Sequence, residues 1–222
     1  MRKILLLLVL SLTVTSLSAR QRMKALSPYQ YGGRWYISAQ VGPQMVPCEH
    51  IESFWKKGHG WEMFTPQAGV ALGCHLNDAW DLRFAGNYSF NKSALNPYKS
   101  FYSYTYRACS AFVDLGLNYN GLGEEYDRFN FKNYLGLGMA YTHRFSEVDH
   151  PFQVVEGPNL VPGFRIGAIM EVDTPGGFGF YADLGIEGFT DWYNGLEPYA
   201  FPFDMVFKVS FGLIYHFPLG RN

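Results

Sequence analysis

The stretch Ser210-Phe-Gly-Leu-Ile-Tyr-His-Phe217 (SFGLIYHF), five residues from the end of the chain, decides the fold. Its apolar side chains mostly alternate with smaller or polar ones, which is the period-2 pattern of a β-strand. Phe211, Leu213, Tyr215 and Phe217 therefore share one face of the strand. A soluble protein would have to cover so bulky a face, and the rest of the chain indicates that lipid covers it.

The composition excludes a helical membrane protein but is compatible with a membrane β-barrel. The mean hydropathy is −0.10, because the polar and apolar faces of barrel strands average to near zero. Charged residues make up 17% of the chain, aromatic residues 18%, and there are 24 glycines. The formal net charge of −1 gives no electrostatic footprint for binding nucleic acid.

The N-terminus has the three parts of a secretory signal peptide. Arg2 and Lys3 precede an apolar segment at 4–10, and Leu17-Ser18-Ala19 resembles a cleavage site. The apolar segment is too short to span a bilayer. We therefore predict a signal peptide at 1–19, cut after Ala19 or, as the competing site, after Ser18, and then a polar, basic periplasmic lead-in at 20–33.

Eight segments with strand-like alternation follow the lead-in. They are 34–43, 64–76, 80–90, 102–119, 131–144, 164–173, 178–190 and 205–217. The apolar face changes parity within 102–119: it begins with Tyr102, Tyr104 and Tyr106 and ends with Val113, Leu115, Leu117 and Tyr119. This change predicts a β-bulge near 108–111, with Tyr106 facing outward and Arg107 inward. Short or moderate connections (77–79, 120–130, 174–177) alternate with longer ones (44–63, 91–101, 145–163, 191–204), as in outer-membrane barrels.

These patterns predict an all-β fold, an eight-stranded antiparallel up-and-down transmembrane β-barrel at 34–217 with a C-terminal tail at 218–222. Ten strands would require hairpins hidden in the loops. An even strand count places both termini on the short-turn side, which is the periplasmic side. No second domain is expected.

Nearly all ionisable strand residues fall on the face opposite the large apolar ones. A Lys or Arg facing lipid at the bilayer midplane costs about 2–4 kcal/mol, so this face is expected to point inward. The lumen of eight strands is only wide enough for side chains. Arg165, Glu187 and Lys208 are expected to meet near the loop end, and Arg83 and Asp114 lower down. A plugging ion network is favoured over an ion or proton path.

The last strand also resembles a known signal. Ser210, Gly212, Tyr215 and Phe217 fill the defined positions of the C-terminal assembly signal of bacterial outer-membrane proteins. The mature chain is similar to the small OmpA/OmpX-type barrels. This resemblance implies insertion by the barrel assembly machinery into the outer membrane of a Gram-negative bacterium, in contact with lipid and lipopolysaccharide.

The sequence contains no convincing catalytic constellation. Lipid A palmitoyltransferases place His, Asp and Ser in surface loops, and here the second long loop has serines but no Asp. Lipid A deacylases place His and Ser two apart, whereas His143 and Ser146 are three apart. A nucleophile must lie within hydrogen-bond reach of its base. We therefore predict no enzyme activity, no catalytic residue and no cofactor.

The cysteines and loop histidines do not indicate a metal site or a disulfide. Cys48, His50 and His59 fit no standard zinc spacing, so no metal is predicted. Cys48, Cys74 and Cys109 form an odd set dispersed over the barrel, and we expect no disulfide.

Aromatic residues in the long loops are the best candidates for contact surfaces. These are Trp55, Trp61, Trp192 and Tyr193. They suggest a non-enzymatic structural or accessory subunit that docks to a partner protein in the outer membrane through its loops and its basic lead-in. The alternatives are a lipid A-modifying enzyme and a narrow solute channel.

Overall fold

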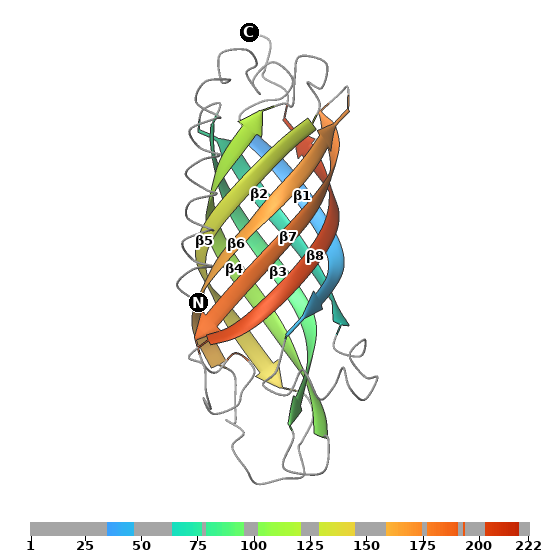
Figure 1. Cartoon of the computed structure of the whole chain (residues 1–222), viewed down its shortest axis with the longest axis vertical. Helices are drawn as coiled ribbons and strands as arrows, with labels where there is room; N and C mark the ends of the chain where they lie inside the picture. The colour runs from blue at the N-terminus through green and yellow to red at the C-terminus, as the bar shows by residue number, and fades with distance from the viewer. Residues whose placement is uncertain are drawn as a thin grey trace, which may run out of the picture.

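In the computed structural model, the described residues are 35–46, 64–76, 79–95, 102–120, 129–144, 159–174, 177–190, 193 and 203–217. They form eight strands: β1 (Trp35–Met45), β2 (Phe64–His75), β3 (Trp80–Leu95), β4 (Tyr102–Asn120), β5 (Phe129–Arg144), β6 (Asn159–Asp173), β7 (Phe178–Thr190) and β8 (Phe203–His216). Consecutive strands pair antiparallel and β8 pairs with β1, which closes the barrel (Figure 1). The predicted eight-stranded antiparallel barrel is confirmed. The described residues contain no helix that is long and apolar enough to cross a membrane.

The two ends of the barrel differ. We call the end at which β1 begins and β8 ends the turn side, and the opposite end the loop side. On the turn side, Tyr36 is the register partner of His216, and the amide of Phe217 donates to the carbonyl of Trp35 at 2.9 Å. On the loop side, the β3–β4 pair continues to Leu95 and extends beyond the other strands (Figure 1).

The predicted β-bulge in the fourth strand is wrong. The pairs of β4 with β3 and β5 run without interruption through 108–111. Tyr106 therefore points inward and is buried, whereas Arg107 points outward and is exposed, the reverse of the predicted orientation. The lumen accepts Tyr106 because its ring packs edge-on against Tyr193, with ring centroids 5.7 Å apart. The prediction failed because it assumed that a tyrosine in this segment faces lipid, whereas a tyrosine can also pack in the lumen.

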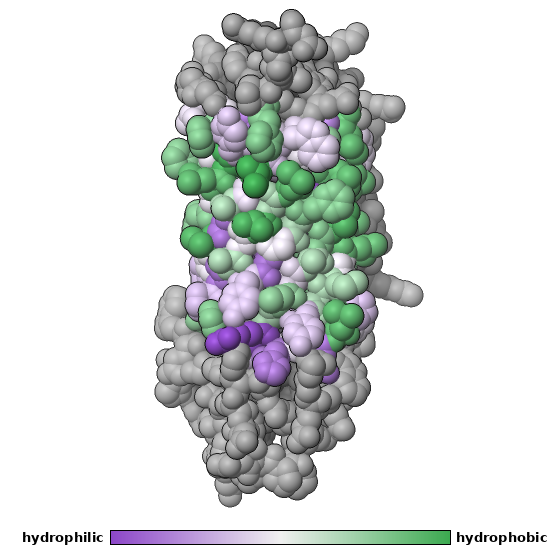
Figure 2. Space-filling model, turned by 180° about the vertical axis from the view of Figure 1, so that it is seen from behind, coloured by the Kyte–Doolittle hydropathy of each residue, from purple (hydrophilic) through white to green (hydrophobic). Residues whose placement is uncertain are grey.

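The outer wall carries large apolar side chains in all eight strands, with Arg107 of β4 and His143 of β5 exposed among them towards the loop side. Most of these apolar side chains keep more than a third of their surface exposed, up to 71% for Leu137. Hydrophobic residues dominate the described part of the face shown in Figure 2, and hydrophilic ones gather towards its lower, loop-side edge. Trp35, Trp80 and Phe217 are exposed on the turn side, and Phe90 and Tyr141 on the loop side. Such a wall is the arrangement expected for contact with lipid between two aromatic belts.

Inside the barrel, inward aromatic rings lie over inward glycines of the neighbouring strand. In each case the two residues are direct partners in the strand register and the ring occupies the space of the missing Cβ. The pairs are Tyr36–Gly73, Phe112–Gly138, Tyr134–Gly167, Tyr181–Gly212 and Phe189–Gly163. The glycines therefore make room for a lumen filled by large side chains.

Candidate functional site

The centre of the lumen contains a continuous ion network around Asp114. This carboxylate accepts from Arg83 Nε at 2.7 Å and from both Nε and Nη2 of Arg165. Arg165 Nη1 lies 3.7 Å from Glu187 Oε1, and Lys208 Nζ donates to the same oxygen at 2.8 Å. The structure thus joins the two groups that the sequence analysis placed separately, because Arg165 contacts both Asp114 and Glu187.

Asp183 completes this central network. Its Oδ2 lies 3.6 Å from Arg83 Nη1, and its Oδ1 accepts from the Tyr134 hydroxyl at 2.7 Å. The guanidinium of Arg83 lies 4.5 Å from the centre of the Tyr134 ring. The central network contains three cations and three anions, namely Arg83, Arg165, Lys208, Asp114, Asp183 and Glu187. Its charges therefore balance, as a buried set must.

A second cluster fills the turn-side end of the lumen. The Tyr36 hydroxyl donates to Asp81 Oδ1 at 2.7 Å, and His75 Nδ1 lies 3.1 Å from Asp81 Oδ2. Lys132 Nζ lies 2.8 Å from Glu171 Oε2 and 3.9 Å from Asp81 Oδ2. This turn-side cluster also includes His216 and Asp173, whose contacts with Glu171 are described below.

An aromatic cluster occupies the loop-side mouth. Tyr193 stacks on Phe189 with ring centroids 4.2 Å apart and planes 4° from parallel. Its hydroxyl accepts from the Asn91 amide at 3.2 Å. Tyr193 is thus 2% exposed and does not offer the contact surface that the sequence analysis proposed. An aromatic ring can pack into the lumen where there is space for it. The position of the residue in the sequence does not reveal whether such space exists.

The described lumen is therefore occupied along its length. Arg165, Asp114, Asp183 and Glu171 have no exposed surface, although all four are ionisable. A charged group stays buried only where paired charges and hydrogen bonds replace water. Paired side chains therefore fill the centre of the described lumen.

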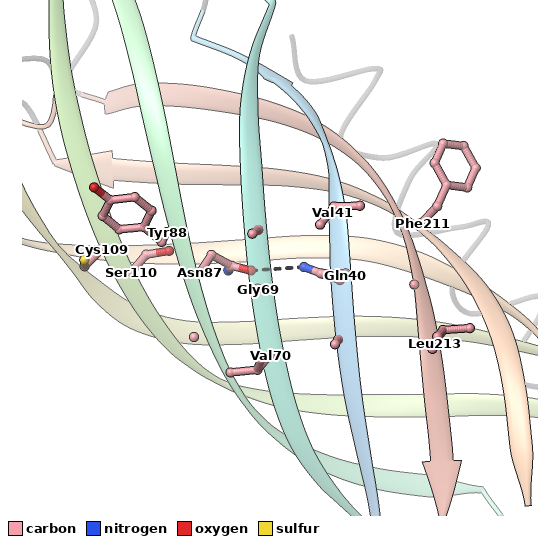
Figure 3. A pocket seen from close by; sticks show the side chains of 14 residues that line it. Gln40, Val41, Gly69, Val70, Asn87, Tyr88, Cys109, Ser110, Phe211 and Leu213 are labelled. Atoms are coloured by element: carbon pink, nitrogen blue, oxygen red, sulfur yellow. Dashed lines mark hydrogen bonds between the residues drawn. The ribbon is translucent and has the colours of Figure 1, made fainter.

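The outer wall has a shallow groove across β8, β1, β2, β3 and β4 (Figure 3). Its lining includes three small outward residues, Ala39, Ala68 and Gly86. Larger side chains stand around them, including Val41, Val70, Tyr88, Phe211 and Leu213. On the lumen side of the same wall, the amide of Gln40 donates to Asn87 at 3.0 Å. The groove is apolar and lies on the surface that faces lipid.

The four residues of the assembly signal lie on both faces of β8 and on the residue that follows it, Phe217. Ser210 is buried in the lumen and accepts from the Gln67 amide, and Gly212 lies under the Tyr181 ring. Tyr215 and Phe217 point outward, with ring centroids 5.5 Å apart. The other proposed loop contacts, Trp55, Trp61 and Trp192, lie outside the described residues, as does Cys48. Cys74 and Cys109 are free.

Sequence reasoning missed part of the lumen. Asp173 and His216 were not recognised as partners of Glu171, and the Tyr134–Asp183 bond was not foreseen. The parity of β8 carried a usable signal, because Lys208, Ser210 and His216 are separated by even numbers of residues and therefore share the inner face. The contact between β6 and β8 could not be predicted from the sequence pattern, because these strands are not neighbours in the sheet.

Comparison with known proteins establishes the fold. No family model and no curated protein sequence matches the chain. Among solved structures, Neisserial surface protein A (NspA) matches with a TM-score of 0.52 at 11% identity, over 84% of this chain and 99% of that one. Ail of Yersinia pestis has a TM-score of 0.44 at 13% identity, over 84% and 99%. OprG of Pseudomonas aeruginosa has a TM-score of 0.44 at 12% identity, over 84% and 98%. The chain therefore has the fold of a small eight-stranded outer-membrane β-barrel similar to NspA.

Proposed function

We propose that this protein is a non-enzymatic barrel of the Gram-negative outer membrane, with both termini in the periplasm, that serves as a structural or accessory subunit for a partner protein in that membrane. The observation that carries the proposal is the filled, charge-balanced lumen. A barrel whose centre is closed by Arg165, Asp114 and their partners has its outer wall and its two rims available for function.

The groove in the outer wall supports docking within the membrane. Small residues let a second lipid-embedded surface approach the barrel backbone closely, as they do between transmembrane helices. Ala39, Ala68 and Gly86 line the groove on three neighbouring strands, and Val70 of β2 lies between Ala39 and Gly86 in the register. A partner with a protruding apolar ridge would fit there better than on the bulky wall elsewhere.

Native purification in mild detergent tests this proposal. We expect a defined outer-membrane protein to co-purify with the wild-type barrel, and we expect Ala68→Trp to reduce its recovery by filling the groove. The matched control is Leu137→Trp on β5, which lies four strands from β1 in the closed order. A barrel that is recovered alone, or equal recovery of the partner with both variants, would refute docking through the groove.

A further inference from the structure

Three side chains with metal-ligand atoms converge at the turn-side end of the lumen. Glu171 and Asp173 are two apart on β6 and turn to the same inner face, and His216 is the last residue of β8. His216 Nε2 lies 2.6 Å from Glu171 Oε1 and 3.4 Å from Asp173 Oδ1. The ligand atoms all lie within 4.8 Å of one another. We call these three residues the turn-side triad.

A single imidazole N–H cannot satisfy two carboxylates. Nε2 of His216 carries at most one hydrogen, and the closer oxygen, that of Glu171, is placed to accept it. Asp173 Oδ1 is then buried without a hydrogen-bond partner among the described residues. Leaving a buried acceptor unpaired is unfavourable, and such an atom in a native structure calls for an explanation. One cation between the three ligand atoms would engage all of them.

We propose that the turn-side triad binds a divalent transition-metal ion of the Zn²⁺ class. One imidazole and two carboxylates are donors that zinc accepts, whereas an imidazole donor disfavours Mg²⁺ and Ca²⁺. Tetrahedral ligands at zinc distances are about 3.4 Å apart. The His216–Asp173 separation of 3.4 Å matches this value, whereas His216 and Glu171, now hydrogen-bonded at 2.6 Å, would exchange their shared proton for the ion and move apart by about 0.8 Å. The Asp173 side chain is 19% exposed, so water can reach a fourth position from the turn side.

The local charge also favours a dication. The turn-side cluster contains three carboxylates, those of Asp81, Glu171 and Asp173, and one ammonium group, that of Lys132. With neutral histidines these groups carry a net charge of −2, which one divalent ion would cancel. Lys132 does not compete for the ligand atoms, because it contacts Glu171 through Oε2 and leaves Oε1 to the triad.

Neighbouring residues hold the ligands in position. The His75 ring is stacked with the His216 ring, with centroids 5.6 Å apart and planes 12° from parallel. Gly179 of β7 lies between Asp173 and Ile214 in the register, and a Cβ there would be 2.6 Å from Asp173 Oδ1. The glycine thus lets the Asp173 carboxylate reach across β7 towards β8. Such outer contacts orient metal ligands and are often as important as the ligands themselves.

The β6–β7 turn fixes two of the ligands through the backbone. The amide of Thr174 donates to Phe178 O at 2.6 Å, and the amide of His216 donates to Gly177 O at 2.7 Å. Gly177 has a φ of 87°, which a glycine adopts without strain. A metal ion at the triad would therefore fasten β6 to β8 beside the β8–β1 seam, and its role would be structural.

The test is metal titration of the full-length barrel, purified without a polyhistidine tag and stripped with a chelator. We expect Co²⁺ to bind at one ion per barrel with a visible absorption band, Zn²⁺ to displace it, and Mg²⁺ to have no effect. His216→Ala removes a direct ligand, and Asp173→Asn replaces a charged carboxylate with a neutral amide that is a much weaker zinc donor, so each should weaken binding by at least about 100-fold. His143→Ala, on the outer wall of β5, is the control and should bind like the wild type.

Asp173→Asn keeps the test decisive if His216→Ala fails to fold, because Asp173 lies at the end of β6 and is partly exposed. Circular dichroism verifies that each variant is folded. As a second measurement, Zn²⁺ should raise the midpoint of thermal unfolding of the wild type but not that of Asp173→Asn. Absence of one-to-one Co²⁺ binding, or equal binding by the wild type and Asp173→Asn, would overturn the proposal. The result does not depend on any partner protein.

Discussion

Asp114 is the residue whose loss should damage the barrel most specifically. It has no exposed surface and accepts hydrogen bonds from both Arg83 and Arg165. The substitution Asp114→Asn keeps the shape of the side chain and removes its charge. The two guanidinium groups would then retain only their more distant carboxylates, Asp183 at 3.6 Å and Glu187 at 3.7 Å.

The expected cost follows from the charge balance of the central network. Asp114→Asn changes its net charge from zero to +1, and all six residues of the network are buried. Removing one partner of a buried ion pair typically costs 3–5 kcal/mol. Because each arginine keeps a second carboxylate, we expect a loss of about 3 kcal/mol in the free energy of unfolding, which is about 150-fold in the folding equilibrium.

Urea unfolding of barrels refolded into lipid vesicles, followed by tryptophan fluorescence and circular dichroism, measures this loss. The matched control is Asp204→Asn, the same substitution at a half-buried residue near the loop-side start of β8. Because Asp204 stays partly solvated, we expect the control to lose clearly less than Asp114→Asn, about 1 kcal/mol. If Asp114→Asn were as mild as Asp204→Asn, the central network would not stabilise the barrel in the way argued here.

Three further outcomes are expected. Gly167→Ala should cost about 1–3 kcal/mol in the free energy of unfolding, because the added Cβ would meet the Tyr134 hydroxyl and the Leu184 carbonyl. Gly86→Ala should be almost neutral, because only Ser110 O lies near the added Cβ, at 3.9 Å. Equal losses for the two variants would contradict the aromatic–glycine packing. Leu137→Arg should cost about 2–4 kcal/mol in vesicles, because this side chain is 71% exposed in the middle of β5, and an unchanged urea midpoint would place it away from lipid. In planar bilayers the reconstituted barrel should carry no current above background, since paired charges fill the lumen, and a reproducible unitary conductance would show that the lumen opens.

The period-2 pattern of the sequence was sufficient to predict the barrel. Outward Leu, Val and Phe alternate with inward polar residues in most strands, so strand number and facing were accessible without coordinates. The exception was β4, where the uninterrupted register turns Tyr106 inward although its hydrophobic ring suggested an outward position. A tyrosine fits both lipid and a crowded lumen, and the tertiary context decides between them.

The lumen contacts could be predicted only between strands that are neighbours in sequence. Arg83 and Asp114 are direct register partners on β3 and β4, and such pairs can be inferred from a hairpin. The bonds from Arg165 to Asp114 and from His216 to Glu171 cross the barrel interior between strands that do not pair. Their existence depends on strand tilt and on the side-chain volumes around them, which the alternation pattern does not encode.

The central claim is that bulky side chains contact acyl chains while ionic and aromatic side chains fill the interior. Methyl-labelled barrel in micelles or nanodiscs tests it directly by nuclear Overhauser effects between protein methyl groups and lipid chains. We expect strong effects for Val70, Leu137 and Leu213, and none for Ile169, Val206 and Ile214, which are 7%, 0% and 4% exposed. Lipid contacts from Val206 or Ile214, with none from Leu137, would contradict the inside-out arrangement of this barrel.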